Sequence, residues 1–274
     1  MEKINVAVLG ATGTVGQKFI ALLNDHPMFH VHELVASEQS AGRAYGDVCR
    51  WKQDTPIPAD IAGKSVRSTN EPLESRLLFS GLDPSVAGEA ERSYAERGHL
   101  VVSNSRNHRM DPLVPLVIPE VNHEHFRLID YQPYEGAIVT NPNCSTIFLA
   151  TALAPLHRAF GVEAVTVTTM QAISGAGYPG ISATDIMGNV IPYIGGEEEK
   201  IERESLKILG ELATDAIVPA EMQISAQCTR VPVTDGHTES VSVRLSRRVD
   251  IEQVKAAPDR KSTRLNSSHV KISY

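Results

Sequence analysis

The stretch Ile4-Asn-Val-Ala-Val-Leu-Gly-Ala-Thr-Gly-Thr-Val-Gly16 places a short β-branched run before three glycines spaced three residues apart. The helical pattern of residues 17–23 follows directly. Glycine lets a backbone turn tightly and approach a pyrophosphate, which binds at the N-terminus of the next helix. A tight strand-to-helix turn without a ligand would use glycine as well. The position of this loop in the first strand–helix unit favours a dinucleotide cofactor.

The first half of the chain alternates strand and helix patterns. Further strands are predicted over residues 30–36, 77–80 and 100–103, with a helix over 84–97 between the last two. This alternation predicts a parallel sheet with helical crossovers. We therefore expect an α/β protein in which residues 1–140 form a Rossmann-type dinucleotide-binding domain.

The pattern changes near Cys144. A helix is predicted over residues 145–160, which Pro155 would shorten or kink, and a long β-branched strand over 162–171. An acidic helix over 197–212 and strands over 221–232 and 238–246 come next. Long strands with few crossovers predict a second, α+β domain over residues 141–258.

The composition is that of an ordinary globular protein. The chain has 274 residues, 42% of them hydrophobic, and a net charge of -7, which disfavours binding to nucleic acid or to an anionic membrane. No run approaches the roughly 20 apolar residues that span a bilayer, and the N-terminal residues lack the apolar core of a signal peptide.

The cysteines are sparse. Cys49, Cys144 and Cys228 show no CxxC spacing. An odd set of this kind argues against a disulfide scaffold and against a zinc site, so we expect no metal. A reducing cytoplasm is the expected compartment, and there a thiol stays available for chemistry.

The end of the second predicted strand indicates which cofactor binds. An NAD site usually ends this strand with an acidic residue that holds the ribose 2′-hydroxyl. Here Ser37, Ser40 and the nearby Arg43 suit a 2′-phosphate better, although Glu38 would still be able to turn into the site. The sequence favours NADP over NAD.

The segment Thr140-Asn-Pro-Asn-Cys144-Ser-Thr146 places one cysteine where a strand ends and a helix begins. Such a cysteine is either a small buried filler or a nucleophile, since a helix N-terminus favours the thiolate. Asn143 and the first N–H groups of the helix would be able to hold an oxyanion, which acyl chemistry needs.

The segment 230–239 offers partners for such a thiol. His237 lies on an Asp-Gly turn between two predicted strands and is the best candidate base, although most histidines on turns are only solvated. Arg230 heads the same segment and would clamp a carboxylate with two parallel hydrogen bonds, unless it only forms a surface ion pair.

Several segments follow the glycine loop in a particular order. They are Ser103-Asn-Ser-Arg-Asn-His-Arg109-Met110, Ile118-Pro-Glu-Val-Asn122, Asn141-Pro-Asn-Cys144-Ser-Thr, Gln171-Ala-Ile-Ser174-Gly175-Ala-Gly177, Glu197-Glu-Glu-Lys200 and Arg230-x6-His237. With the glycine loop, they resemble the aspartate-semialdehyde dehydrogenases, and the first three resemble the archaeal and fungal branch. The resemblance runs to about residue 249.

This resemblance implies a role for each matching residue. Cys144 attacks the carbonyl carbon and becomes an acyl-thioester, His237 is the general acid and base, and Gln171 orients the substrate. Arg230 and Glu197 hold its carboxylate and amino groups, and Arg109 and Lys200 bind phosphate. The cofactor-binding residues that we expect are Gly10, Thr12, Gly13, Thr14, Val15, Gly16, Ser37, Gln39, Ser40, Ser80, Gly81, Ser174, Gly175 and Gly177.

The reaction implied is the NADPH-dependent reduction of aspartyl phosphate to aspartate semialdehyde, a step toward lysine, threonine and methionine. The family also implies a homodimer or homotetramer formed through the second domain. Two alternatives stay open. One is a malonyl-CoA reductase on the same scaffold, which Glu197 disfavours because malonyl has no amino group. The other is an inactive NADP-binding sensor or assembly module.

The C-terminal residues depart from the family pattern. Residues 259–274 are basic, lack periodicity and resemble a translated read-through tail that occurs in unrelated proteins. Family members continue well beyond the point where the resemblance stops. We therefore expect residues 259–274 to be foreign to the fold and the second domain to be incomplete.

Overall fold

The computed structural model describes residues 2–259 and divides them into two compact units. The first unit contains residues 2–115 and 126–141, and the second contains residues 116–125 and 142–259. Residues 260–274, which hold most of the segment expected to be foreign, lie outside the described residues.

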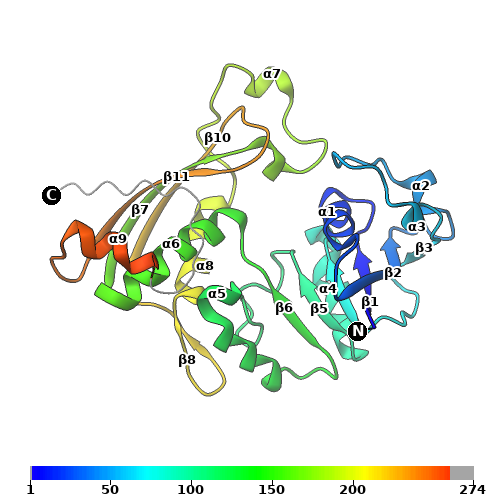
Figure 1. Cartoon of the computed structure of the whole chain (residues 1–274), viewed down its shortest axis with the longest axis horizontal. Helices are drawn as coiled ribbons and strands as arrows, with labels where there is room; N and C mark the ends of the chain where they lie inside the picture. The colour runs from blue at the N-terminus through cyan, green and yellow to red at the C-terminus, as the bar shows by residue number, and fades with distance from the viewer. Residues whose placement is uncertain (1, 260–274) are drawn as a thin grey trace. The chain divides into compact units, whose positions relative to one another are not determined.

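The first unit is built around a parallel sheet of six strands in the order β3-β2-β1-β4-β5-β6 (Figure 1). The strands are β1 (Ile4–Leu9), β2 (Phe29–Ala36), β3 (Val66–Ser68), β4 (Leu77–Ser80), β5 (Leu100–Ser103) and β6 (Ala137–Thr140). The helices are α1 (Thr14–Leu23), α2 (Tyr45–Val48), α3 (Ala59–Ala62) and α4 (Pro84–Glu96), and η1 (His123–Tyr131) is a 3₁₀ helix that crosses into this unit. This strand order reverses between β1 and β4, as in a dinucleotide-binding fold, so the Rossmann prediction is confirmed.

Helices cover both faces of this sheet, and β1 shows why its sequence suits that position. Val6 and Val8 belong to one apolar cluster, together with Ile20 of α1. The intervening Ala7 and Leu9 belong to another cluster. Because successive side chains of a strand point to opposite faces, a continuous apolar run fills a core on each side.

The second unit is α+β, as predicted. Its main sheet has the order β10-β7-β11, with β7 (Val162–Gln171) parallel to β10 (Gln223–Arg230) and antiparallel to β11 (Thr238–Leu245). Helices α6 (Cys144–Phe160) and α8 (Glu197–Ile208) pack on one face of it (Figure 1). The smaller elements are α5 (Pro119–Asn122), η2 (Ile173–Ala176), α7 (Ala183–Ile186), β8 (Glu211–Leu212), β9 (Ile217–Val218) and α9 (Ile251–Asp259).

Two helices differ from the sequence prediction. Helix α6 continues through Pro155, because Leu153 before the proline and Leu156 after it both pack in the same apolar core. Helix α8 was predicted to reach residue 212 but ends at Ile208, and Glu211–Leu212 pairs with β9 instead. A Cβ on Gly210 would lie 2.3 Å from the Val218 carbonyl oxygen, so glycine permits this close turn.

The boundary between the units also differs from the expected single division at residue 140. Residues 116–125 belong to the second unit, although they precede β6 in the chain. Leu116, Ile118 and Val121 pack in one apolar cluster with Ala150 and Ala154 of α6. Because these side chains are buried against α6, residues 116–125 belong to the second unit and not to the first.

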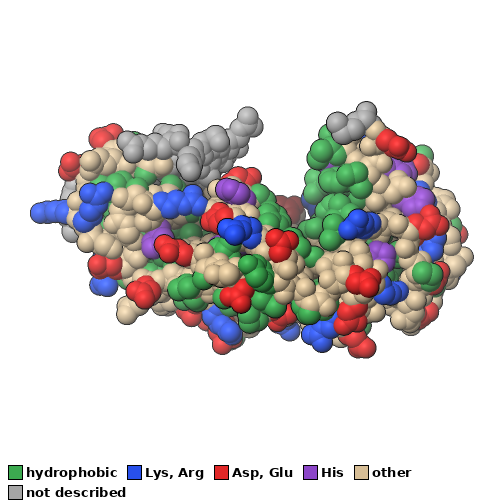
Figure 2. Space-filling view, turned by 90° about the horizontal axis from the view of Figure 1, so that it is seen from below, with side chains coloured by type: hydrophobic (Ala, Val, Ile, Leu, Met, Phe, Trp, Pro, Cys, Tyr) green, Lys and Arg blue, Asp and Glu red, His purple; other side chains and the backbone are tan. Residues whose placement is uncertain are grey.

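The surface shown in Figure 2 carries acidic and basic side chains interspersed over each unit. No helix within residues 2–259 is long and apolar enough to cross a membrane. Within the same residues, no group of three His, Cys, Asp or Glu side chains is arranged to hold a metal ion.

A pair of glycine substitutions tests the packing of the first loop. Gly10 and Gly42 both have positive φ, of 71° and 75°, so alanine is strained at either position. A Cβ on Gly10 would also lie 2.6 Å from the Gly81 carbonyl oxygen, whereas the described residues leave open space around Gly42. We expect Gly42→Ala to cost about 1–2 kcal/mol of stability and Gly10→Ala to cost about 1–3 kcal/mol more. Urea unfolding of both variants measures this difference, and equal losses would show that the loop relaxes freely.

Candidate active site

Cys144 is the first residue of α6, and the residue before it explains why the helix begins there. The Asn143 side-chain oxygen Oδ1 accepts hydrogen bonds from the backbone N–H groups of Ser145 (3.0 Å) and Thr146 (3.3 Å). Asparagine is among the preferred residues for this capping position. The cap places the Cys144 thiol at the positive end of the helix dipole, and Cys144 is exposed to solvent.

His237 is the nearest titratable partner of this thiol. Its Nε2 lies 3.1 Å from Cys144 Sγ, and its Nδ1 accepts a hydrogen bond from the Ala172 backbone N–H at 3.0 Å. The Phe148 ring packs edge-on against the imidazole at a centroid distance of 6.3 Å. The structure thus brings together the cysteine and histidine that the sequence analysis selected, 93 residues apart.

Arg230 and Gln171 lie opposite each other at the ends of β10 and β7. Both are buried, with 4% and 1% of their surface exposed. Arg230 Nη1 donates to the Ala172 carbonyl oxygen at 2.7 Å and lies 3.5 Å from Gln171 Oε1. Among the described residues, the Arg230 Nε atom has no hydrogen-bond partner. Arg230 is therefore a buried cation beside the cysteine–histidine pair.

Glu197, at the start of α8, is held by the residues around it. It accepts hydrogen bonds from Asn143 Nδ2 at 2.7 Å and from Lys200, with which it forms an ion pair. Burial alone would raise the pKa of Glu197, but the hydrogen bonds and charge of Lys200, with Asn143 and Gln171, lower it on balance. The carboxylate is therefore ionised at neutral pH. Lys200, which was expected to bind phosphate, forms an ion pair with Glu197 in this structure. Asn143 both caps α6 and donates a hydrogen bond to Glu197.

The thiol and the imidazole are both biased toward their neutral forms. The surrounding protein atoms and the Glu197 charge raise the pKa of the Cys144 thiol, against the N–H groups of Ser145 and Cys144 and the charge of Arg230. Burial and the Arg230 charge lower the pKa of His237, and Glu197 opposes them. Both shifts favour a thiol and a neutral imidazole over a thiolate–imidazolium pair.

The expected cofactor residues of the first unit gather at the ends of β1, β2 and β4. Gly13 precedes α1, whose first turn has no acidic residue. Its first N–H groups have no acceptor within the helix, and an anion is favoured there. Gly10, Gly16 and Gly81 pack so closely that a Cβ on any of them would clash with a neighbouring backbone or Val15. The packing of this loop therefore requires glycine at these positions, and the start of α1 beside it is suited to an anion such as a pyrophosphate.

The residues after β2, which are predicted to bind the 2′-phosphate, are accessible. Ser37 and Gln39 are exposed and Ser40 is partly exposed. The Oε1 atom of Glu38 accepts a hydrogen bond from Asn70 at 3.2 Å, which engages the one carboxylate in this loop. Thr12, Thr14 and Val15 lie in the loop and first turn of α1, and Ser80 ends β4.

For four further residues of the expected site, the contacts with phosphate or with the cofactor stay predictions. Arg109 belongs to the first unit, where it is buried and donates to the Asn104 carbonyl oxygen at 2.9 Å. Ser174 and Gly175 lie in η2 of the second unit, and Gly177 follows with a φ of 70°. A Cβ on Gly175 would lie 2.9 Å from Arg230 Nη1 and 3.5 Å from His237 Nε2, so Gly175 lines the pair directly.

Two contacts around the site and one perturbed carboxyl group were not predicted. The backbone N–H of Ala172 donates to His237, and its carbonyl oxygen accepts from Arg230. Backbone groups are common to all residue types, so the sequence does not indicate these contacts. Glu204 accepts from the Asn143 backbone N–H at 2.7 Å. Glu204 follows Glu197 by seven residues, which is two turns of α8. This spacing places both carboxylates on one face of the helix, so it would have identified Glu204 as a candidate site residue. Burial raises the pKa of Glu239, two residues after His237, to about 8.

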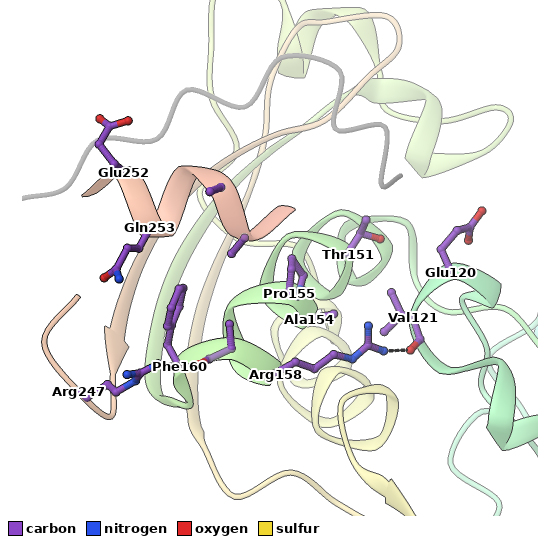
Figure 3. A pocket seen from close by; sticks show the side chains of 13 residues that line it. Glu120, Val121, Thr151, Ala154, Pro155, Arg158, Phe160, Arg247, Glu252 and Gln253 are labelled. Atoms are coloured by element: carbon purple, nitrogen blue, oxygen red, sulfur yellow. Dashed lines mark hydrogen bonds between the residues drawn. The ribbon is translucent and has the colours of Figure 1, made fainter. Parts of the chain in front are cut away.

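A cavity of about 640 Å³ lies elsewhere in the second unit (Figure 3). Its lining comes from α5, α6, Arg247 and α9, and Arg158 on its wall donates a hydrogen bond to the Val121 carbonyl oxygen. None of the expected site residues lines this cavity. The chemistry of the cysteine–histidine pair is therefore separate from it.

The fold and the site define a semialdehyde dehydrogenase. Residues 5–129 match the family described as semialdehyde dehydrogenase, NAD binding domain, and residues 153–272 match semialdehyde dehydrogenase, dimerisation domain. The second match includes part of the segment that we expected to be foreign.

Individual relatives narrow the family further. An aspartate-semialdehyde dehydrogenase of Methanothermobacter thermautotrophicus is 48% identical, over 94% of this chain and 76% of that protein. One from Cryptococcus neoformans is 50% identical, over 89% and 71%. The crystal structure of the Candida albicans enzyme with NADP superposes with a TM-score of 0.86 at 44% identity, over 93% and 76%. This chain belongs to the aspartate-semialdehyde dehydrogenase family.

These findings confirm the predicted family, with its archaeal and fungal relatives, the α/β fold and an oxidoreductase that uses NADP. The second unit is a dimerisation domain. The roles of the individual site residues stay predictions.

The charge of Glu197 provides a test of the thiol environment. Because a nearby carboxylate disfavours the thiolate, Glu197→Gln should lower the pKa of Cys144. In the unsubstituted chain, the alkylation rate of Cys144 by iodoacetamide should rise with a midpoint above the pKa of an unperturbed cysteine thiol. In Glu197→Gln the midpoint should shift downward, so alkylation at pH 7 becomes faster. Mass spectrometry of the Cys144 peptide measures both profiles, and an unchanged midpoint would contradict the assigned electrostatics.

Gly175 provides a second test, with Gly195 as its control. Gly175→Ala would press a methyl group against Arg230 and His237, whereas a Cβ on Gly195 meets open space within the described part of the chain. We expect Gly175→Ala to lower kcat/KM by about 10-fold or more and Gly195→Ala to change it little. Both variants should unfold at similar temperatures. Equal activity of Gly175→Ala and Gly195→Ala would show that catalysis does not depend on the positions of Arg230 and His237 beside Gly175.

Proposed function

We propose that this protein reduces aspartyl phosphate to aspartate semialdehyde with NADPH, through a thioester on Cys144. The observation that carries the proposal is the 3.1 Å approach of His237 Nε2 to Cys144 Sγ beside the buried Arg230. Family membership supports it, since relatives with this name are 48% and 50% identical.

Cys144 supplies the nucleophile in this reaction. Its sulfur attacks the acyl carbon, a C–S bond forms, and the C–O bond to the phosphoryl group breaks. The thiol proton ends on the departing phosphate, so a thiol and an acyl phosphate give a thioester and hydrogen phosphate. The N–H groups of Ser145 and Cys144 favour negative charge on sulfur during this attack.

The glycine loop from Gly10 to Gly16 would hold the cofactor pyrophosphate, and Ser37, Gln39 and Ser40 the 2′-phosphate. NADPH supplies the hydride that reduces the thioester carbon. The product is the alkoxide form of a thiohemiacetal on Cys144, and its collapse breaks the C–S bond, releases the aldehyde and returns the sulfur as a thiolate. His237 Nε2 lies within hydrogen-bond distance of the Cys144 sulfur, so His237 would stabilise the negative charge on that sulfur.

The charged side chains suit a substrate with a carboxylate, an amino group and a phosphate. Arg230 is buried beside Gln171 and would bind the carboxylate. Glu197 is ionised and would accept from the substrate ammonium. Lys200 and Arg109 would bind the phosphate, with Lys200 shared between phosphate and Glu197. A malonyl-CoA substrate has no ammonium group, so the same ionised Glu197 disfavours it.

We propose a homodimer or homotetramer, for which the match to a dimerisation domain is the support. The proposed compartment is the cytoplasm, since the three cysteines are free thiols without a disulfide partner among the described residues. Small molecules, not nucleic acid or a membrane, are the proposed ligands.

Removal of the thiol tests the proposed function. Cys144→Ala should abolish phosphate-dependent reduction of NADP with aspartate semialdehyde, because no other group forms the thioester. NADP binding should persist, since the proposed pyrophosphate loop lies in the first unit. Cys49→Ala, which removes a half-buried thiol of the first unit, is the matched control and should stay active.

The absorbance of NADPH measures the phosphate-dependent reduction of NADP with aspartate semialdehyde. In a parallel assay, the same absorbance measures the oxidation of NADPH with malonyl-CoA. Substantial activity of Cys144→Ala would overturn the nucleophile assignment. Turnover of malonyl-CoA but not of aspartate semialdehyde would replace the proposed substrate.

A further inference from the structure

Glu91 lies on α4 of the first unit with none of its surface exposed to solvent, and the proposed reaction does not use it. Its Oε1 atom accepts hydrogen bonds from the hydroxyl groups of Ser80 at 2.6 Å and of Ser103 at 2.8 Å. A carboxyl group is costly to bury unless hydrogen bonds compensate for the lost water. Burial accordingly raises the pKa of Glu91, although both serines and the charge of His108 oppose it. One buried acceptor therefore serves two hydroxyl groups.

The two serines are the last residues of neighbouring strands. Strand β4 pairs with β5 in parallel, and the register places Ser80 beside Ser103. Side chains of residues in register point to the same face of a sheet, which is why one side chain of the covering helix reaches both. Both serines are completely buried. The Glu91 carboxyl group therefore joins the ends of two strands at the edge where the expected cofactor residues gather.

The residue after Ser80 packs against the glycine loop. The Gly81 backbone N–H donates to the Leu9 carbonyl oxygen at 2.9 Å. A Cβ on Gly10 would lie 2.6 Å from the Gly81 carbonyl oxygen, so these two backbones leave no space between them. A shift at the end of β4 would therefore displace the backbone on which the glycine loop rests.

The residues after Ser103 lead to Arg109. The Ser103 hydroxyl oxygen accepts the Ser105 backbone N–H at 3.0 Å, so its own proton is left to point at Glu91. The carbonyl oxygen of the intervening Asn104 accepts from Arg109 at 2.9 Å. The position of Arg109 therefore depends on the end of β5, just as the glycine loop depends on the end of β4.

We propose that Glu91 is a positioning residue for the cofactor site: it ties the ends of β4 and β5 together through two serine hydroxyl groups and so fixes the turn at Gly81 that supports the glycine loop. Ser80, which was expected to bind the cofactor, then acts through Glu91 and this turn, and its hydroxyl group makes no bond to NADP. The same link sets the start of the segment that carries Arg109, and this part of the inference rests on the proposed function.

Two substitutions separate the hydrogen bonds of Glu91 from its charge. Glu91→Leu removes the acceptor and leaves two buried hydroxyl groups without a partner, so the strand ends should shift. Glu91→Gln keeps Oε1 and changes only the Oε2 position, which accepts no hydrogen bond from the described residues and lies 3.9 Å from His108 Nε2. Both variants should be less stable, but only Glu91→Leu should weaken NADP binding, by about tenfold. Glu89→Leu, at an exposed position of α4, is the control and should leave the affinity unchanged.

A double-mutant cycle tests how Ser80 acts. In the unsubstituted chain, Ser80→Ala should weaken NADP binding by about fivefold, because it removes one of the two hydrogen bonds that hold the strand ends. In Glu91→Leu the link is already broken, so Ser80→Ala should have little further effect. A direct bond from the Ser80 hydroxyl group to NADP would instead give the same loss in both chains, and this result would overturn the proposal.

The fluorescence of bound NADPH measures the affinity, and urea unfolding measures the stability, so neither measurement needs turnover. Equal affinities of Glu91→Leu and Glu91→Gln would overturn the role of the two hydrogen bonds. Should Glu91→Leu not fold, Glu91→Asp takes its place in both tests. Aspartate keeps the charge but is one methylene shorter, so it should weaken NADP binding where glutamine does not. Equal affinities of Glu91→Asp and Glu91→Gln would overturn the proposal.

The assay of phosphate-dependent NADP reduction tests the part of the inference that concerns Arg109. At saturating NADP, Glu91→Leu should raise the KM for phosphate by about fivefold, and Glu91→Gln should leave it close to that of the unsubstituted chain. An unchanged KM in Glu91→Leu would overturn the link to Arg109. Absence of turnover in the unsubstituted chain would overturn the proposed function, while the NADPH affinities would still decide the role of Glu91.

Discussion

The central position of β7 in its sheet is the constraint on which the candidate site depends. β7 is hydrogen-bonded to β10 along one edge and to β11 along the other. Its register places Arg230 beside Gln171 and Thr238 beside Met170. The ends of β7 and β10 and the turn before β11 therefore meet at one edge of the sheet. A slip of β10 by one residue against β7 would turn Arg230 to the face opposite Gln171, so this register is what keeps the two side chains together.

Asn143 connects this edge of the sheet to the nucleophile. Its side chain caps α6 and donates to Glu197 on α8, and its backbone N–H donates to Glu204 on the same helix. One residue thus sets where the helix of Cys144 begins and how the carboxylate beside it is held. Burial and the Glu197 charge both raise the pKa of the Cys144 thiol, so Asn143 also influences the nucleophile through the carboxylate that it holds.

Much of the fold follows from local patterns in the sequence. The β-branched run before Gly10 and the alternation after it predict a parallel sheet, because a strand buried on both faces must be apolar throughout. The errors lie where tertiary packing outweighs local preference. Helix α6 passes through Pro155 because its neighbours stay buried, and α8 stops at Ile208 because Gly210 lets β9 approach. Residues 116–125 join the second unit through contacts with α6 that no local pattern encodes.

The candidate site divides in the same way. The sequence by itself determined which side chains carry chemistry, since a cysteine after an asparagine cap, a histidine on a turn and a glycine-rich loop are visible without coordinates. It also determined the family, through the order of these segments. Only the tertiary structure decided the pairing of Cys144 with His237 across 93 residues and the engagement of Lys200 by Glu197. The Ala172 backbone N–H donates to His237 Nδ1, and every residue except proline has such an N–H group. No sequence pattern reveals this contact, because only the position of Ala172 at the end of β7 brings the group to the histidine.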